Sequence, residues 1–230
     1  MRNAGTVLVV AAHPDDEVLG CGGTIARLAG EGHAVYVAIL GEGITSRYDE
    51  REGADQQSIR ALHDRSRQVS KLLGVTELFT YDLPDNRFDT VPMLDVVKIV
   101  ERLMERLKPE VIYTHHGGDL NVDHVTVHRA VLTASRPVGG CPVRTIYAFE
   151  VPSSTEWAFN RFDPVFRPNT FMDISATLEI KIDAMKLYES ESRLFPHPRS
   201  PEALRAIALR WGSAVGLEAA EAFELIREIC

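Results

Sequence analysis

The sequence predicts an α/β protein, a Rossmann-like three-layer α/β/α sandwich with a mostly parallel sheet and C-terminal helices. Two observations predict this class. Over residues 6–150, short apolar runs that are typical of strands alternate with longer amphipathic runs that are typical of helices. The first run, residues 6–12, has no polar side chain after Thr6, as expected of a strand whose sheet is covered on both faces.

Each element of this alternation has its own signal. Glycine often follows the last turn of a helix, so Gly30 and Gly74 are expected to end two helices, and Pro109 follows a third. The polar stretch 41–54 predicts a loop, and the residues around Pro84 predict a turn. The expected strands are 6–12, 33–40, 77–81, 111–114 and 145–149, and the expected helices between them are 18–30, 58–73, 93–107 and 123–134.

The pattern changes after residue 150. Residues 151–170 are rich in Pro, Phe and Asn and predict irregular structure. A short edge strand is expected at 171–174, followed by helices at 176–190 and 201–229, the second one with a break at Gly212 or Gly216 left open. We therefore expect a Rossmann-like metal-binding core at 1–150 and an extension at 151–230 that packs on the same domain.

Composition narrows the classes of function. The chain has 230 residues with 25 Lys and Arg against 33 Asp and Glu, a net charge of −8, which argues against a nucleic-acid partner. Its three cysteines form no CxxC pair, which indicates reduced thiols and a cytoplasmic location. We expect no signal peptide and no membrane span, because no apolar run approaches about 20 residues. Whether the chain forms a homo-oligomer is left open, because the apolar faces of the terminal helices suit either a core or a subunit contact.

The first run of charged residues stands where the first strand ends. It reads His13-Pro14-Asp15-Asp16-Glu17. Acids are favoured at a helix N-terminus, but an imidazole with three carboxylates after a buried strand favours a metal site. His13 and Asp16 are spaced to reach one ion, which leaves Asp15 free to accept a proton from a bound water, and Glu17 to brace a ligand or cap the next helix.

A third ligand is expected from the end of the fourth strand, because the carboxyl ends of parallel strands meet at one edge of the sheet. His124 is the preferred ligand, and Asp123 beside it is expected to orient the site or hold a catalytic proton. His128 lies one helical turn further, as a partner of the site or as a core residue. His115 and His116 end the strand and suit structural or pocket-lining roles.

Together these segments give the chain a resemblance to a known family. It resembles the PIG-L/LmbE-type zinc-dependent N-deacetylases in His13-Pro14-Asp15-Asp16-Glu17, in Gly20-Cys21-Gly22-Gly23-Thr24 and in Asp119-Leu120-Asn121-Val122-Asp123-His124. The resemblance covers about residues 5–150. It implies a Rossmann-like hydrolase that removes an N-acetyl group, commonly from an N-acetylglucosamine-type sugar, and releases acetate and a free amine. It also implies that His13, Asp16 and His124 bind Zn²⁺, or another divalent transition metal, and that Asp15 is the general base.

One position departs from the family pattern. Many members carry a histidine three residues before the last ligand, where this chain has Asn121. An asparagine can donate a hydrogen bond to an oxyanion but cannot supply a proton near neutral pH. The acid role then falls to Asp15 or to one of three histidines, His128, His116 and His197.

Substrate contacts are expected from loops above the sheet. Arg65 and Asp85 suit a hydroxyl-rich ligand, His116 suits the pocket wall, and His197 lies in a proline-rich loop that can reach the mouth of the site. The sequence leaves open which acetylated sugar or conjugate is the substrate.

Competing interpretations are weaker. A dinucleotide-binding enzyme needs the glycine pattern GxGxxG, whereas Ile25 stands where the third glycine belongs, and the preceding acids would repel a pyrophosphate. A metal-dependent hydrolase of a non-sugar amide or ester, and a non-catalytic metal-binding protein of the same fold, stay as alternatives.

Overall fold

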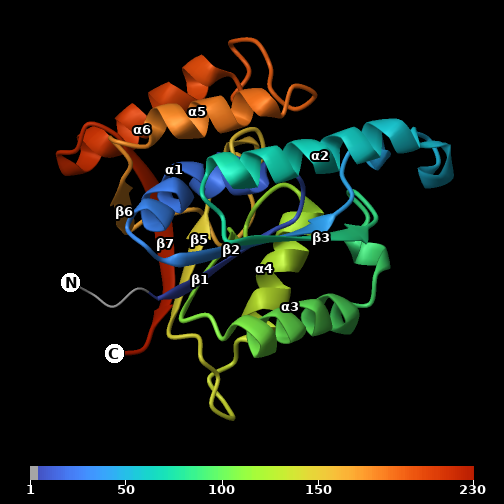
Figure 1. Ribbon diagram of the computed structural model, residues 1–230, viewed down its shortest axis with the longest axis horizontal. Helices are drawn as coiled ribbons and strands as arrows, with labels where there is room; N and C mark the ends of the chain where they lie inside the picture. The colour runs from blue at the N-terminus through green and yellow to red at the C-terminus, as the bar shows by residue number, and fades with distance from the viewer. Residues whose placement is uncertain (1–4) are drawn as a thin grey trace.

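The computed structural model describes residues 5–230 and consists of one mixed seven-stranded sheet between two layers of helices (Figure 1). The sheet order is β3-β2-β1-β4-β5-β7-β6, in which β1 to β5 are parallel and β7 runs antiparallel to both β5 and β6. This arrangement confirms the predicted α/β sandwich with a mostly parallel sheet. The strands are β1 (Thr6–Ala11), β2 (Ala34–Gly41), β3 (Glu77–Leu83), β4 (Val111–His115), β5 (Thr145–Phe149), β6 (Thr170–Asp173) and β7 (Ala220–Glu228).

Helices cover both faces of the sheet. α1, α2, α5 and α6 pack on one face, and α3 and α4 pack on the other (Figure 1). The helices are α1 (Asp16–Gly30), α2 (Gln56–Leu72), α3 (Met93–Leu107), α4 (Val122–Ala134), α5 (Leu178–Leu187) and α6 (Pro201–Val215), with short 3₁₀ turns at Thr45–Arg47, Arg51–Gly53, Phe88–Thr90 and Glu156–Ala158. Within residues 5–230, no helix combines the length and apolarity that crossing a membrane requires.

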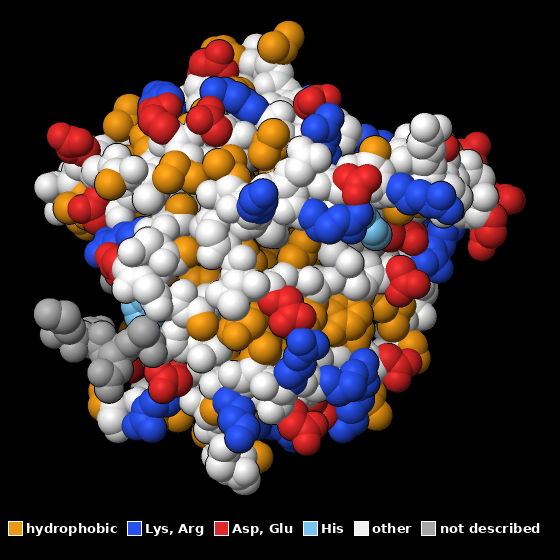
Figure 2. All heavy atoms as spheres, in the orientation of Figure 1, with side chains coloured by type: hydrophobic (Ala, Val, Ile, Leu, Met, Phe, Trp, Pro, Cys, Tyr) orange, Lys and Arg blue, Asp and Glu red, His pale blue; other side chains and the backbone are white. Residues whose placement is uncertain are grey.

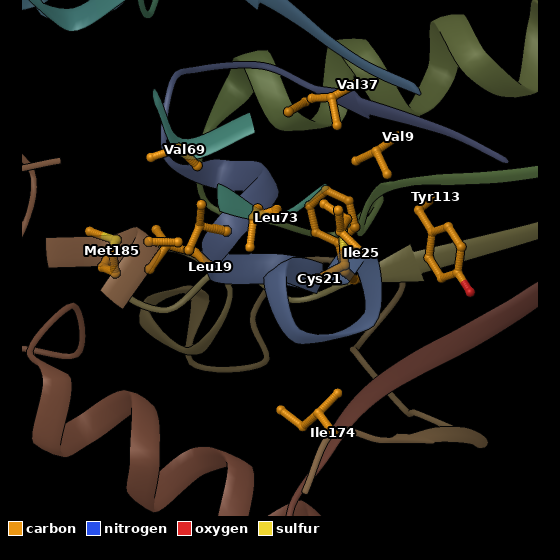
Figure 3. Close-up of a cluster of buried hydrophobic side chains, with 14 of the residues drawn as sticks. Val9, Leu19, Cys21, Ile25, Val37, Val69, Leu73, Tyr113, Ile174 and Met185 are labelled. Carbon is orange, nitrogen blue, oxygen red and sulfur yellow. The ribbon is translucent and has the colours of Figure 1, made fainter. Parts of the chain in front are cut away.

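The C-terminal part shares the core of the first part. Ile174 and Met185 belong to the same buried apolar cluster as Leu19, Ile25 and Val9, which are all labelled in Figure 3. All five side chains are at most 2% exposed. On the face drawn in Figure 2, charged side chains of both signs are interspersed.

The expected helix at 201–229 is wrong in its second half. α6 ends at Val215, where Gly216 takes the left-handed conformation with φ 76° and caps the helix. Residues 220–228 then form β7, which pairs with both β5 and β6. Its alanines and glutamates favour a helix, but pairing on both edges and burial of its first residues override that propensity. The expected edge strand at 171–174 is confirmed as β6, and the helix expected at 176–190 is shorter, as α5.

The topology positions the site. β1 and β4 are neighbours in the sheet, with Val7 opposite Val111 and Val9 opposite Tyr113. Their carboxyl ends therefore open at the same edge, and the loops that leave them, β1–α1 and β4–α4, lie side by side.

Candidate metal centre

The loop from β1 to α1 turns sharply at Asp15. Asp15 has φ 103°, a left-handed conformation that is uncommon for a residue with a side chain. Its backbone N–H donates to Glu17 Oε2 at 3.1 Å, while the His13 N–H donates to Asp16 Oδ2 at 2.8 Å. These contacts hold the loop so that Asp15 and Asp16 take different directions at the start of α1.

Three side chains from the two loops converge. His13 Nδ1 lies 3.3 Å from Asp16 Oδ2, and His124 Nε2 lies 3.3 Å from the same oxygen. The three potential ligand atoms all lie within 4.8 Å of one another. Asp16 and His124 are each 1% exposed. The donor set of two imidazoles and one carboxylate is that of a catalytic zinc site, which leaves a position for water.

Further carboxylates face the remaining ring nitrogens: Asp123 and Asp85 lie at His13 Nε2, and Asp119 lies at His124 Nδ1. His13 Nε2 lies 2.8 Å from Asp123 Oδ2, and His124 Nδ1 lies 3.1 Å from Asp119 Oδ1. Each carboxylate favours a proton on the ring nitrogen that faces it, so the opposite nitrogen, the one nearer Asp16, keeps its lone pair. Asp119 is itself held by the hydroxyls of Ser154 and Thr155. The residues present therefore fit a divalent cation between His13, Asp16 and His124.

The electrostatics of the cluster favour positive charge at its centre. Burial by itself would lower the pKa of His124, but Asp16 and Asp119 raise it to about 9. Burial opposes the charged form of Asp16 as well, yet His124 and His115 hold the pKa of Asp16 well below its usual value. Protons and a metal ion would compete for the same imidazoles.

His115 plays a different part. Its Nε2 accepts the Ala12 N–H at 2.8 Å, and its ring stacks on the ring of His124 with 4.0 Å between centroids. Burial and the neighbouring His124 lower the pKa of His115 well below its usual value. His115 is therefore a neutral ring packed against the candidate ligand His124.

Asp15 faces a hollow beside the three candidate ligands. Burial raises the pKa of Asp15 well above its usual value, and the guanidinium of Arg199 opposes that rise. The hollow has a volume of about 150 Å³ and a largely polar lining. It is lined by His13, Pro14, Asp15, Gly43, Ile44, Ser46, Arg47, Leu62, Asp85, Asn86, Asn121, Glu191 and Arg199.

Two residues singled out in the sequence, Asp85 and Asn121, line this hollow. Asp85 Oδ2 accepts from the Ser46 hydroxyl at 2.7 Å and from the Ser46 N–H at 3.1 Å. Asn121 caps α4 by accepting the Asp123 N–H at 2.8 Å, and its Nδ2 donates to Asn86 Oδ1 at 2.9 Å. Among the described residues, no acceptor contacts the second hydrogen of this amide, which leaves it for a ligand in the hollow. Asp123 is placed behind His13, which favours an orienting role over a proton-transfer role.

Two predicted histidines lie outside the hollow. His128 is 9% exposed, and its Nδ1 lies 2.8 Å from the carbonyl oxygen of its neighbour His115. His116 is held by Glu224 through Nδ1 and by the Pro164 carbonyl through Nε2, both at 2.7 Å. These contacts engage both ring nitrogens of His116 and Nδ1 of His128, and neither residue lines the hollow.

Arg65 and His197 also lie elsewhere. Arg65 pairs with Glu189 at 3.1 Å and lines a neighbouring surface hollow. His197 accepts the Arg199 N–H through Nδ1 at 3.1 Å, and its ring meets Trp157 edge-on. The loop of His197 does reach the site, but it contributes Arg199 in place of the histidine.

Arg199, Glu191 and Ser46 are site residues that sequence reasoning did not select. Arg199 lies 184 positions from its partner Asp15, so no spacing rule connects them. The only sequence signal was the proline-rich loop around His197.

Two imidazoles and a carboxylate converging at a strand edge of an α/β fold are compatible with metal-dependent hydrolysis. The sequence profile of the PIG-L family, described as GlcNAc-PI de-N-acetylase, matches residues 8–135, more than half of the chain. The chain belongs to this family, whose enzymes are deacetylases, hydrolases of amide bonds.

Curated relatives span most of the chain. It is 27% identical over 190 residues to the uncharacterized deacetylase YaiS of Escherichia coli K12, covering 80% of this chain and 90% of that protein. It is 24% identical to diacetylchitobiose deacetylase of Thermococcus kodakarensis, covering 96% and 82%. It is also 28% identical to 4-oxalmesaconate hydratase of Pseudomonas putida, covering 85% and 79%.

Proposed function

We propose that this chain is a zinc-dependent deacetylase that hydrolyses the N-acetyl group of an N-acetylglucosamine-type sugar or sugar conjugate. The observation that carries the proposal is the convergence of His13, Asp16 and His124 beside the Asp15 carboxylate at the hollow. The family's description and the diacetylchitobiose deacetylase of Thermococcus kodakarensis support an acetylated amino sugar as substrate. The three cysteines are unpaired, which supports a reducing, cytoplasmic compartment.

The metal would be held by His13, Asp16 and His124. When bound, such an ion polarises the acyl oxygen and lowers the pKa of a coordinated water toward ~7. Asp123 and Asp119 fix the ring orientation of the two imidazoles.

Asp15 is the proton carrier in this proposal. As water attacks the acyl carbon, Asp15 accepts its proton, and Asn121 donates its unused amide hydrogen to the developing oxyanion. The C–N bond then breaks and Asp15 returns the proton to the departing nitrogen, which gives acetate and a free amine. We assign both transfers to Asp15 because His116, His128 and His197 lie outside the hollow.

Polar side chains at the mouth suit the sugar. Asp85, Asn86 and Ser46 form one hydrogen-bonded group, and they line the same hollow as Glu191 and Arg199. Such groups can exchange their mutual hydrogen bonds for hydroxyls of a ring substrate.

Acetate release from N-acetylglucosamine and N,N'-diacetylchitobiose tests the proposal. We expect zinc-loaded protein to release acetate and a chelator to abolish the release. Asp15→Asn should lower kcat by about 10²–10⁴-fold with zinc content unchanged, because it removes the proton acceptor and keeps the ligands. Asp183→Asn, the same change in a 60% exposed side chain, is the matched control and should leave kcat unaltered.

Two results would overturn the proposal. One is full turnover by Asp15→Asn, which would exclude Asp15 as the base. The other is a zinc-loaded protein that releases no acetate from either sugar but hydrates 4-oxalmesaconate, the substrate class of the Pseudomonas putida relative.

A further inference from the structure

Arg199 reaches into the site from the far end of the chain. Its Nη1 donates to Asp15 Oδ2 at 2.7 Å, and its Nε donates to Ser153 Oγ at 2.7 Å. Nη1 also lies 3.6 Å from Glu191 Oε2. The guanidinium thus donates hydrogen bonds to Asp15 and Ser153, both remote in sequence, and forms an ion pair with Glu191 of its own loop.

The contact with Arg199 gives the two oxygens of the Asp15 carboxylate different surroundings. The side chain is 2% exposed, and Oδ2 is occupied by the charged hydrogen bond from Arg199. No donor among residues 5–230 forms a hydrogen bond to Oδ1, so this oxygen stays available at the hollow. The hydrogen bond from Arg199 therefore leaves Oδ1 as the oxygen that can accept a proton.

The backbone of Asp15 needs such an anchor. Its φ of 103° is a sparsely populated conformation, and positions of this kind persist only where the surroundings fix them. The Glu17 carboxylate fixes the backbone N–H, and Arg199 fixes the side chain.

Arg199 is itself braced from the pocket mouth. Glu191 receives two hydrogen bonds from Arg47 Nη2, at 2.7 and 2.6 Å, and so stays beside Arg199. Arg47, Glu191, Arg199 and Asp15 form a row of alternating charges from the mouth to the proton carrier. In such a row each side chain restricts the next one.

We propose that Arg199 is a positioning residue that holds the Asp15 carboxylate in the orientation required for proton transfer. The inference rests on the proposed function, because it acts through Asp15 as the proton carrier. It assigns a catalytic purpose to the segment between α5 and α6, which contributes no metal ligand.

Arg199→Met tests the proposal, measured as acetate release per folded, zinc-loaded enzyme. We expect kcat to fall about 10–100-fold, since a misplaced catalytic group costs that much, with KM within about 2-fold and zinc content unchanged. Arg199→Lys should recover part of the loss, because lysine keeps the charge but has no fork to contact Asp15 and Ser153 together. Arg205→Met, the same change in an exposed ion pair with Glu179, is the matched control and should leave kcat unaltered.

A double-mutant cycle that combines Arg199→Met with Asp15→Asn distinguishes a positioning role from direct contact with substrate. If Arg199 acts through Asp15, Arg199→Met should change kcat by less than about 3-fold in the Asp15→Asn background. An undiminished loss in that background, or a raised KM with unchanged kcat, would show that Arg199 binds substrate and would overturn the proposal.

Failure of the proposed function gives a different result. In that case the wild-type enzyme itself releases no acetate, and a crystal structure of Arg199→Met becomes the readout. A turned Asp15 carboxylate supports the positioning role, and an unmoved one overturns it.

Discussion

The loops that follow β1 and β4 differ from the chain beyond residue 170 in how they serve the site. The two loops supply His13, Asp15, Asp16 and His124, all from short motifs. The C-terminal part supplies no ligand, yet it touches those motifs through Arg199 at Asp15 and through the Tyr188 hydroxyl at Glu17. Reactive groups are gathered in one region, and the contacts that fix them come from the other.

The difference has a physical origin. Metal ligands must lie within a few ångströms of one ion, and short loops at adjacent strand ends meet that need locally. Buried carboxylates also need donors and opposite charges, and these can come from any segment that packs nearby. The C-terminal part could thus be altered in ways that leave the metal bound and still disturb its surroundings.

The largest effect that separates the two regions is expected at Lys181. Its Nζ donates to Glu221 Oε1 at 2.5 Å and to the Leu19 carbonyl at 2.9 Å, and it joins α5, β7 and α1. Lys181→Met leaves the buried Glu221 without its cation, so we expect the free energy of unfolding to fall by about 3–5 kcal/mol in denaturant titration.

Lys186→Met is the control, because Lys186 is 55% exposed on the same helix and should change stability little. Equal losses in the two variants would contradict the role of the buried pair. Loss of zinc from folded Lys181→Met would contradict the separation of the two regions.

A smaller effect is expected where the regions meet, at Glu17. Burial raises the pKa of Glu17 from 4.5 to about 7, so between these values the folded chain binds a proton that the unfolded chain has released. Stability from this group is therefore present below about pH 4.5 and is lost as the pH rises through about 7. Glutamine does not titrate. In metal-free protein, the free energy of unfolding of Glu17→Gln should therefore rise by about 2 kcal/mol relative to that of wild type as the pH increases from about 5.5 to about 8.

Unfolding of both proteins at several pH values in the presence of a chelator measures this difference. Glu189→Gln, a change in a 72% exposed side chain, should show no such dependence. A constant difference between wild type and Glu17→Gln would show that the carboxyl does not change protonation in this range.

A further effect, on zinc affinity and not on stability, is expected within the first region, at Asp119. Asp119→Asn replaces the carboxylate beside His124 Nδ1 with a neutral amide, which can present a donor and favour the other tautomer. We expect zinc affinity to fall about 10–100-fold in competition with a chelator, with the fold retained. Unchanged affinity would mean that Ser154, Thr155 and the stacked His115 orient the site without this charge.

Much of the fold can be predicted from the sequence because the signals that define its elements are local. The apolar run of β1 and the helix-ending Gly74 need no knowledge of distant contacts, and the strands β1 to β5 lie within a few residues of their expected bounds. The prediction of a helix over β7 is wrong because it follows the local sequence, in which alanines and glutamates favour a helix. Its conformation depends on pairing with β5 and β6, and on Glu221 accepting the N–H groups of Gly23 and Thr24.

The candidate site divides in the same way. The residues of His13-Pro14-Asp15-Asp16-Glu17 determined by themselves that imidazole and carboxylate meet at a strand end, because adjacent residues cannot separate. Only the tertiary structure placed Arg199 beside Asp15 and left His116 and His128 outside the hollow. These placements depend on burial and on partners far along the chain. Such contacts contribute free energy only once the chain has folded.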